Sequence, residues 1–559
     1  MLKEFDAFGD SCLSMKRRHD KMRRPTKAAG LLLGLLFLVA CTAGNAGYSS
    51  AEYDRSLAAR LFTAGYQDIA SVYIEEVSPR QLAAAGLSEL HELDERLEFH
   101  RTDEGSLELL LNQQPARSYR LPRRDEDYSA WGRLTAEALD DARGLSPSLA
   151  AAESEALYST VFRGIVGELD RYSRYAGQDI AKENRASRTG FGGIGVRINA
   201  EEEGVRILSV MEDTPAERAG LQDNDLILAV DGESAANLDQ LEVVRRLRGP
   251  VNSSVTLQIR RDEVGEPFAI TVQRAHIVPQ TVSHYVEDGV AIFRISGFNH
   301  ASTSVLRQKL SEVEQQLGDE LSGYILDLRS NPGGLLDQAV GVADLFLENG
   351  RIVSTHGRHP DSHQYFESRR DPWIPHRPMV VLVNGNSASA SEIVAAALQD
   401  ADRALVVGSS SFGKGTVQTV LRLPNEGELT LTWARFHAPS GYSLDQRGVM
   451  PDICTSLPEA EEEELLLQIR RGENRIYREL RQLQIDVDNE TALADFRSHC
   501  PSDNRESDRE LRIALKLLQD NSLYMAALGR PTITAEVPQL PSDEPSLETI
   551  TAEGVTAPQ

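Results

Sequence analysis

Cysteine and histidine are scarce in this sequence, and their spacing excludes several kinds of site. The 559 residues include four cysteines, and no two of them form a Cys-x-x-Cys pair. This spacing excludes a zinc ribbon and a dithiol redox motif. The 12 histidines form no His-Glu-x-x-His motif, which is the pattern of a common metalloprotease centre. We therefore predict neither a metal site nor a cofactor.

Basic residues are fewer than acidic ones. The chain has 59 Lys and Arg residues against 85 Asp and Glu residues, which gives a formal net charge of −26 at pH 7. A field of this sign repels phosphate backbones, so we predict no nucleic-acid partner. The hydrophobic fraction of 41% and the charged fraction of 26% are those of an ordinary globular protein. At ~150 residues per domain, the length allows roughly three to four domains.

The apolar run near the N-terminus is too short to span a membrane comfortably. It covers residues 28–40 and follows a basic stretch at 16–27, whereas a hydrocarbon layer of ~30 Å needs about 20 apolar residues in a helix. A basic stretch followed by a short apolar run is typical of a secretory signal. We therefore assign residues 1–40 to a signal segment and predict export to a bacterial periplasm or cell envelope.

The four residues at the end of this run carry a second signal. Residues 38–41 read Leu-Val-Ala-Cys and resemble the lipobox of bacterial lipoproteins. The resemblance implies that Cys41 becomes the lipidated first residue of the mature chain and brings the protein to a membrane surface. A plain cleaved signal and a short uncleaved anchor remain alternatives. In an exported protein, Cys454 and Cys500 are the only pair left for a disulfide, and two free thiols are the other reading.

Residues 41–188 are predicted to form a mainly helical N-terminal region. The apolar pattern is helical over 48–95 and 151–169, strand-like over 96–123 and polar over 124–150. We interpret residues 124–150 as a polar connector, and the whole stretch of about 96–150 as an insert.

The residue pattern of 189–276 is typical of a small β domain, and its start is rich in glycine. The pattern predicts strands over 205–210, 226–230 and 255–260, a short helix over 215–220 and a helix over 238–247. This order, with an Asp-Gly turn after the second strand, resembles a PDZ domain of the bacterial, circularly permuted kind. The resemblance implies that backbone N–H groups bind the terminal carboxylate of a protein tail, which adds as a strand. The implied loop is Gly192, Gly193, Ile194 and Gly195. Asn224 stands where this family usually has glycine.

Residues 277–457 alternate strands with helices, which predicts an α/β layered domain. Residues 458–559 begin with an acidic run, which we interpret as a solvated helix start. They continue with amphipathic helices over 465–483 and near 510–518, and end in a Pro/Thr/Ser/Glu-rich stretch that we expect to be disordered.

One motif in the α/β region has the residues of a nucleophile at a helix start. A buried strand over 379–383 runs into Ser-Ala-Ser-Ala-Ser-Glu at 387–392 and then into an alanine-rich helix. Serines are common helix N-caps, which gives a purely structural reading. A helix N-terminus also directs free amides outward, so a serine there is well placed for attack, with amides nearby to hold an oxyanion.

A second motif imitates a phosphate-binding loop. Residues 408–414 match Gly-x-x-x-x-Gly-Lys after a strand, but Gly415 stands where a Mg²⁺-binding hydroxyl is required. The following residues, 417–423, read as a strand rather than a phosphate-binding helix. We therefore reject phosphate binding.

Several motifs together resemble the carboxyl-terminal processing proteases, also called tail-specific proteases. They are the serine motif at 387–392, Phe-Gly-Lys-Gly at 412–415, Leu-Arg-Ser-Asn-Pro-Gly-Gly at 328–334, and the stretches 436–441 and 448–453. The resemblance covers about residues 67–457. It implies a protease domain with the ββα spiral shared by crotonase and Clp-type folds, a PDZ domain, and helical regions at both ends.

The resemblance also implies roles for individual residues. Ser389 matches the family's nucleophile, Lys414 its general base, and Gln418 the glutamine that orients the lysine. The implied oxyanion hole combines the amide of Ala390 with one from the turn at Gly333 and Gly334.

The chemistry sets a condition on Lys414. A lysine with the ordinary pKa of ~10.4 is protonated near neutrality and cannot act as a base. Burial must lower the pKa, and a shift of ~3 units costs ~4 kcal/mol, which a protein core can supply.

The sequence thus predicts an exported serine endopeptidase that recognises protein C-terminal tails and cleaves through an acyl-enzyme. The alternative is a non-catalytic PDZ scaffold that only binds such tails. The insert and the tail are unlike the family core, and we expect them to make any oligomer or adaptor contacts.

Overall fold

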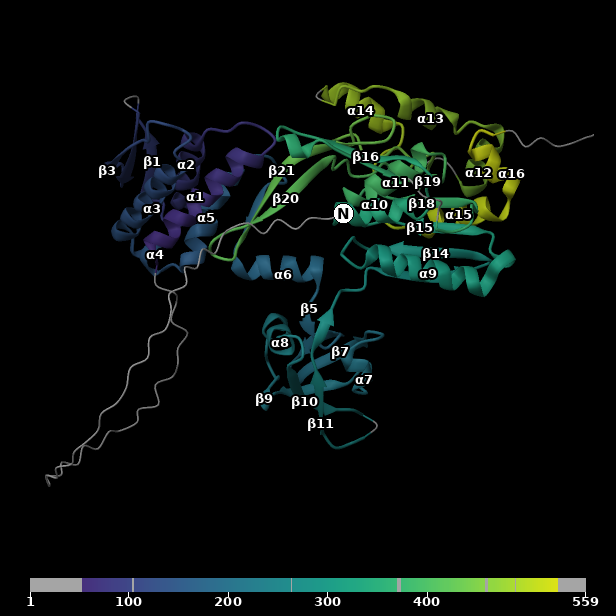
Figure 1. Ribbon diagram of the computed structural model, residues 1–559, viewed down its shortest axis with the longest axis horizontal. Coiled ribbons are helices and arrows are strands. Elements are labelled where there is room, and N and C mark those ends of the chain that lie inside the picture. The colour runs from purple at the N-terminus through teal and green to yellow at the C-terminus, as the bar shows by residue number, and fades with distance from the viewer. Residues whose placement is uncertain are drawn as a thin grey trace, which may run out of the picture. The chain divides into compact units, whose positions relative to one another are not determined.

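The computed structural model describes residues 53–530, except for 103–104, 263, 369–372, 458–460 and 488. The predicted signal segment, Cys41 and the expected disordered end of the chain lie outside the described residues. Within the described ranges, no helix is both long enough and apolar enough to cross a membrane. Contacts group the described residues into one compact unit, and Figure 1 labels its helices and strands.

The N-terminal region is a cluster of helices, as expected. Its helices are α1 (Arg55–Val72), α2 (Pro79–Ser88), α3 (Tyr128–Leu145), α4 (Pro147–Ala151), α5 (Ser154–Gly167) and α6 (Gln178–Thr189). Apolar side chains from α1, α2, α3 and α5 share one buried cluster. Ser78 caps α2 by accepting a hydrogen bond from the Arg80 amide, and Pro79 occupies its first turn, where the missing N–H costs nothing.

The expectation of a polar connector over 124–150 is wrong. Most of this stretch forms α3, which buries Trp131, Leu134, Ala138 and Ala142. These four positions follow helical spacing, but the many charged residues between them hide the pattern in the sequence. The preceding residues form an antiparallel sheet of β1 (Leu97–Arg101), β2 (Ser106–Leu111) and β3 (Gln114–Arg120), which agrees with the strand-like pattern there.

The predicted PDZ region contains the expected order of elements. Its main sheet has the order β11-β10-β8-β7-β6. The strands are β6 (Val196–Glu201), β7 (Gly204–Val210), β8 (Leu226–Val230), β9 (Glu233–Ser234), β10 (Ser254–Arg260) and β11 (Phe268–Gln273), and the helices are α7 (Pro215–Arg218) and α8 (Gln240–Leu247). A separate pair, β5 (Phe191–Gly193) and β12 (Ala275–Ile277), closes the two ends of the region. Asn224 has φ 70°, a left-handed conformation that asparagine tolerates, which explains how it replaces a glycine.

A mostly parallel sheet forms the centre of the α/β region. Its order is β13-β14-β15-β18-β19-β22, and every pair from β14 to β22 is parallel. The strands are β13 (Val282–Glu287), β14 (Val290–Ile295), β15 (Gly323–Asp327), β18 (Met379–Val383), β19 (Leu405–Gly408) and β22 (Ile453–Cys454). The helices α9 (Ser302–Leu317), α10 (Leu336–Asp344) and α11 (Ala390–Asp400) belong to the same region.

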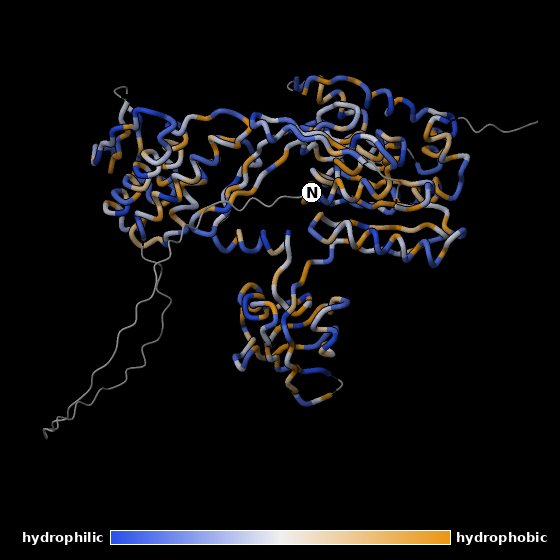
Figure 2. The backbone as a smooth tube through the Cα atoms, in the orientation of Figure 1, coloured by the Kyte–Doolittle hydropathy of each residue, from blue (hydrophilic) through white to orange (hydrophobic). Residues whose placement is uncertain are grey.

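Both faces of this sheet are covered, which accounts for its continuous apolar strands. Leu326 and Val381 lie in one buried cluster with α9, α10 and α11, while Ile325 and Val380 lie in another with the C-terminal helices. Figure 2 shows the hydrophobic segments gathered within this part of the chain. A second sheet has the order β17-β16-β21-β20 and is joined by β4. Its strands are β4 (Arg174–Ala176), β16 (Gly350–His356), β17 (Gln364–Ser368), β20 (Thr416–Arg422) and β21 (Glu428–His437).

The C-terminal region contains α12 (Glu462–Arg471), α13 (Arg475–Gln482), α14 (Glu490–Ser498), α15 (Asp508–Gln519) and α16 (Asn521–Ala527). The expectation of one helix over 465–483 is wrong, because Gly472 adopts a left-handed conformation and ends α12. Cys454 and Cys500 form a disulfide, which decides between the two readings that the sequence left open. The domain boundaries proposed from the sequence stay predictions.

Candidate active site

Ser389 is the residue of the serine motif that the fold leaves accessible. It follows β18 and forms the N-cap of α11 with φ 60° and ψ −114°, a strained backbone for a residue other than glycine. Ser389 is 8% exposed, whereas Ser387 and Ser391 are fully buried. Ser387 Oγ donates to the Leu328 carbonyl at 2.8 Å, and Ser391 Oγ donates to the Asn331 carbonyl at 2.9 Å. The two outer serines therefore stabilise the turn that presents Ser389.

Glu392, which the sequence analysis did not single out, ties the two predicted reacting residues together. Its Oε2 atom accepts hydrogen bonds from the Ser389 amide at 2.7 Å and from the Lys414 amide at 2.9 Å. Its Oε1 atom accepts from the Gly413 amide at 2.7 Å and from Ser411 Oγ. The side chain is fully buried, and burial raises the pKa of Glu392 while these four donors act against that rise. The signal in the sequence was its position three residues after Ser389, which is that of a capping box.

The surroundings of Lys414 shift its pKa in the direction that a general base requires. Burial lowers the pKa of its amine below the ordinary lysine value, and the charge of Arg174 acts in the same direction. Lys414 Nζ lies 5.1 Å from the centre of the Tyr172 ring. No hydrogen bond within the described residues joins it to Ser389 Oγ. The structure therefore brings the two backbones together and directs the lysine side chain to an aromatic face.

Gln418 lies on β20, four residues beyond Lys414. Its Nε2 atom donates to Thr416 Oγ1 at 2.8 Å and to Thr432 Oγ1 at 3.3 Å. In the described part of the chain it makes no hydrogen bond with Lys414, so the orienting role stays a prediction. The motif at 408–414 is followed by the strand β20 rather than by a helix. This agrees with our rejection of a phosphate-binding loop.

The predicted oxyanion turn lies directly against Ser389. A Cβ atom added to Gly333 would lie 2.8 Å from Ser389 Cβ and 3.0 Å from the Ala390 nitrogen, so only glycine fits there. The Gly333 amide donates to Asn331 Oδ1 at 2.8 Å. Within the described residues the amides of Ala390 and Gly334 have no such acceptor. Of the two glycines, Gly334 is therefore the one with an amide free for a substrate.

The predicted carboxylate-binding loop is only partly a loop: Gly192 and Gly193 belong to β5, which pairs with β12, and Ile194 and Gly195 lead into the edge strand β6. β6 is the last strand of the main sheet of the PDZ region, and Gln240 at the start of α8 donates to the Ile198 carbonyl on this strand at 3.4 Å. A Cβ atom on Gly192 would lie 2.0 Å from the Gly249 carbonyl oxygen, which explains a glycine at this position. Arg248 lies 3.9 Å from the centre of the Phe191 ring.

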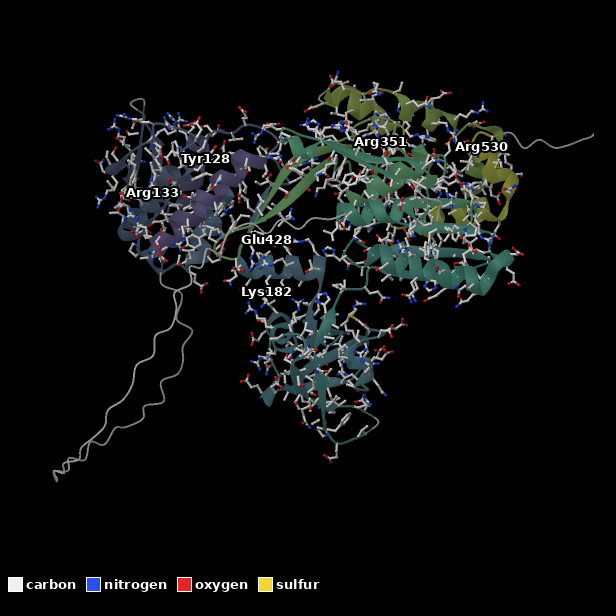
Figure 3. The ribbon with its side chains drawn as sticks, in the orientation of Figure 1. Tyr128, Arg133, Lys182, Arg351, Glu428 and Arg530 are labelled. Atoms are coloured by element: carbon white, nitrogen blue, oxygen red, sulfur yellow. A yellow bond between two sulfur atoms is a disulfide. The ribbon has the colours of Figure 1, made fainter. Side chains whose placement is uncertain are left out.

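Helix α6, which precedes the PDZ region, is held to the β20–β21 hairpin by a buried carboxylate. Arg185 and Arg188 both donate to Glu428 Oε1, at 3.0 and 2.7 Å. Figure 3 labels Glu428 at the end of this hairpin and Lys182 on α6. Because Glu428 is buried, removal of either arginine would leave its charge less well paired.

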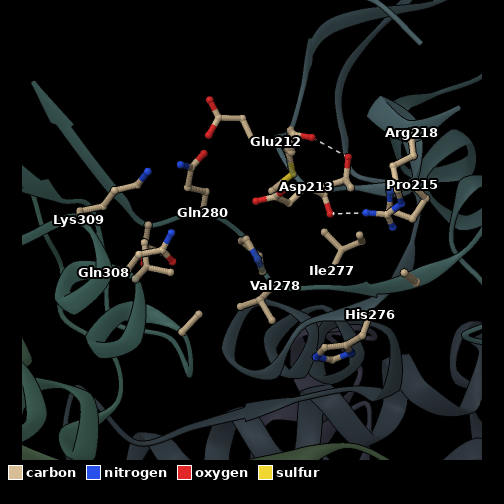
Figure 4. Close-up of a pocket in the computed structure, with 17 residues that line it drawn as sticks. Glu212, Asp213, Pro215, Arg218, His276, Ile277, Val278, Gln280, Gln308 and Lys309 are labelled. Atoms are coloured by element: carbon tan, nitrogen blue, oxygen red, sulfur yellow. Dashed lines mark hydrogen bonds between the residues drawn. The ribbon is translucent and has the colours of Figure 1, made fainter. Parts of the chain in front are cut away.

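A separate cavity lies between the loop before α7, β12 and α9. Figure 4 shows Asp213, Arg218, His276 and Lys309 among the side chains that line it, with Arg218 donating to the Asp213 carbonyl. Its lining includes none of the residues predicted to act on a peptide. The cavity is therefore not the reacting centre.

Comparisons with known proteins agree with the motifs. Residues 289–455 match the family model of peptidase family S41, and residues 206–261 match the PDZ domain model. The first match falls on the parallel-sheet region, and the second runs from β7 to β10. Together with the observed helices and sheets, they confirm the predicted fold class.

Bacterial relatives extend the likeness over most of a whole protein. The carboxy-terminal-processing protease of Bartonella bacilliformis is 36% identical over 376 residues, which are 67% of this chain and 85% of the relative. The carboxy-terminal processing protease CtpA of Bacillus subtilis is 30% identical over 310 residues, 55% of this chain and 66% of the relative. A solved photosystem II D1 C-terminal processing protease is 22% identical, with 72% of this chain and 95% of the other covered and a TM-score of 0.35. The extent of the first match decides the assignment: the chain belongs to the carboxy-terminal processing proteases, serine-type peptidases of family S41, and carries their PDZ domain.

Proposed function

We propose that this protein is an exported endopeptidase in which Ser389 is the nucleophile and Lys414 the general base. The observation that carries the proposal is the Glu392 carboxylate, one oxygen of which binds the amides of both residues. This shared contact keeps the two backbones in a constant relation. The lowered pKa of Lys414 and the free amides beside Ser389 also support the proposal. We assign catalysis to residues 277–457.

The first half of the reaction forms an acyl-enzyme. The Lys414 side chain turns from the Tyr172 ring toward Ser389, and its neutral amine accepts the proton of the Ser389 hydroxyl. The oxygen attacks the peptide carbonyl, and the amides of Ala390 and Gly334 donate to the oxyanion that forms. The C–N bond then breaks, and Lys414 gives its proton to the leaving amine. Gln418 holds the lysine stem between these steps.

The second half releases the product. Neutral Lys414 takes a proton from water, and the resulting hydroxide attacks the ester carbonyl at Ser389. The same two amides hold the second oxyanion. The ester bond breaks, Ser389 recovers its proton from Lys414, and the new C-terminus leaves.

Substrate tails enter through the PDZ domain, which we assign to residues 189–276. Our reason is that β6 is an edge strand, so an extended peptide can add to it by main-chain hydrogen bonds. The N–H groups of the loop Gly192, Gly193, Ile194 and Gly195 then receive the terminal carboxylate. The test is deletion of residues 190–276. We expect cleavage of full-length proteins to fall far more than cleavage of short unstructured peptides, and a uniform loss would count against tail capture.

Export is supported by the residue pattern of 1–41 and by the Cys454–Cys500 disulfide, because disulfides persist mainly in oxidising compartments. Mass spectrometry of the mature N-terminus tests lipidation directly. A diacylated Cys41 is the expected result, and a mature chain that begins elsewhere would contradict the lipid anchor.

The decisive experiment compares peptide cleavage by the wild type, Ser389→Ala and Lys414→Ala. We expect both variants to lose at least ~10³-fold in kcat, as is usual when a nucleophile or its base is removed. Lys309→Ala, a change of the same size outside the site, serves as the control. Equal activity in the wild type and both site variants would contradict the proposed Ser389/Lys414 mechanism.

A further inference from the structure

A segment beyond the family-model match lies against the turn that presents Ser389. Residues 501–507, which we call the brace, connect α14 to α15, whereas the peptidase match ends at residue 455. The Gly385 amide donates to the Asp503 carbonyl at 2.8 Å. Asn386 Nδ2 donates to the Asn504 carbonyl at 3.2 Å. A Cβ atom on Gly385 would lie 2.3 Å from both Ser502 Oγ and Asn504 Oδ1, so the two segments are in direct contact.

The brace also contacts the segment that carries Lys414. Ser409 follows β19, and its hydroxyl both donates to the Asp503 carbonyl and accepts from the Asp503 amide, each at 3.1 Å. Ser409 is buried. The carbonyl of one residue, Asp503, therefore accepts hydrogen bonds from the turn before Ser389 and from the start of the loop that leads to Lys414.

Both ends of the brace are held in place. The Cys454–Cys500 disulfide joins the residue before the brace to β22, and both cysteines are buried. Ser456 Oγ donates to the Pro501 carbonyl at 2.6 Å. At the other end, Arg329 donates to the Ser507 carbonyl at 2.7 Å. Main-chain groups of a segment held at both ends are well suited to maintain a distance, because they have no side-chain rotamers to lose.

We propose that the brace is a positioning element for catalysis, which sets the Ser389 turn and the Lys414 loop at their working separation. The inference rests on the proposed roles of Ser389 and Lys414. Its physical basis is that misplacement of reacting groups by ~1 Å costs up to ~10²-fold in rate. The brace touches neither substrate nor reacting atoms, so its effect falls on kcat rather than on KM.

Two neighbouring serines provide a matched test. Ser409→Ala removes both hydrogen bonds to Asp503, whereas Ser410→Ala removes a hydroxyl whose contact is Met450 Sδ at 3.8 Å. In cleavage of a short unstructured peptide, we expect Ser409→Ala to lower kcat ~10-fold with KM unchanged. Ser410→Ala should stay within ~2-fold of the wild type, because it leaves the brace intact.

Amide hydrogen exchange gives a readout independent of activity. In Ser409→Ala, exchange over 384–390 should be faster by ~10-fold than in Ser410→Ala, at equal melting temperature. The double variant Cys454→Ala/Cys500→Ala should show the same local change. Equal kcat and equal exchange in the two serine variants would contradict the positioning role proposed for the brace. Wild-type activity in Ser389→Ala would instead overturn the proposed function, and the exchange comparison would still decide whether the brace holds these segments.

Discussion

The segments that carry Ser389 and Lys414 differ in how firmly the fold holds the reacting group. Ser389 sits on a one-carbon side chain at the N-cap of α11, between two buried serines whose hydroxyls are hydrogen-bonded. Lys414 has one hydrogen bond within the described residues, through its backbone amide, and its amine ends over the Tyr172 ring. The nucleophile is therefore placed by the main chain, whereas the base is placed by the rotamers of a long side chain.

The difference has a chemical reason. A serine oxygen has one torsion to adjust, so fixing its backbone fixes the oxygen. A lysine amine is separated from its backbone by four methylenes and must also lose its proton, so its environment decides both where it lies and whether it is neutral. Substitutions that disturb the shared anchor should affect both residues, while those around the lysine should affect only the base.

The largest effect is expected from the shared anchor. Glu392→Gln places an N–H₂ group where a carboxylate oxygen accepts two hydrogen bonds, so either the Ser389 and Lys414 amides or the Gly413 and Ser411 donors lose their partner. We expect kcat to fall ~10²-fold, equivalent to ~2.7 kcal/mol, and the melting temperature to fall. Glu463→Gln, on the exposed face of α12, is the control. Full activity in Glu392→Gln would show that the two segments keep their relation without this carboxylate.

A smaller effect is expected from Gln418, whose predicted role is to orient the base alone. If Gln418 orients the lysine as proposed, Gln418→Ala should lower kcat ~10-fold at unchanged stability, because the Ser389 turn is untouched. Thr432→Val, which removes one of the two hydroxyls that Gln418 contacts, should have a weaker effect in the same direction. A loss confined to KM would mean that Gln418 acts on substrate and not on the lysine.

The smallest effect is expected from the charge next to the base. Arg174 lowers the pKa of Lys414, so Arg174→Met should raise it and move the acid limb of the kcat/KM profile to higher pH. We expect activity on that limb to fall ~3-fold and the plateau at high pH to stay unchanged. Arg133→Met, the same change on α3, is the control. An acid limb that does not move would assign the limb to a group other than Lys414.

Several elements could be predicted because their residues alone impose them. The strand Leu226–Val230 was expected with the observed bounds, and the apolar run at 379–383 followed by serines predicted the observed strand and helix start. The order of elements in the PDZ region was also expected. By contrast, the charged residues of α3 masked its buried face, and the break at Gly472 was missed because the amphipathic pattern continues through it.

The site was predictable to a similar extent. Ser389 and the turn at Gly333 and Gly334 were noticed because they follow strand ends, and the resemblance to the processing proteases assigned roles to them and to Lys414; these roles stay predictions. The link through Glu392 was not noticed, since a glutamate at that position is first of all a helix cap. The contacts of Gln418 with two threonines also depend on a neighbouring strand that is distant in sequence.

The sequence by itself determined the local pieces: a serine at a helix start, a lysine in a glycine-rich loop, a glycine turn and a PDZ-like order of strands. Each follows from short-range sterics and from the period of apolar residues. Only the tertiary structure decided that Cys454 joins Cys500, that one buried carboxylate binds the amides of Ser389 and Lys414, and that residues 501–507 lie against both segments. These contacts join residues far apart in the chain, and packing, not local pattern, selects them.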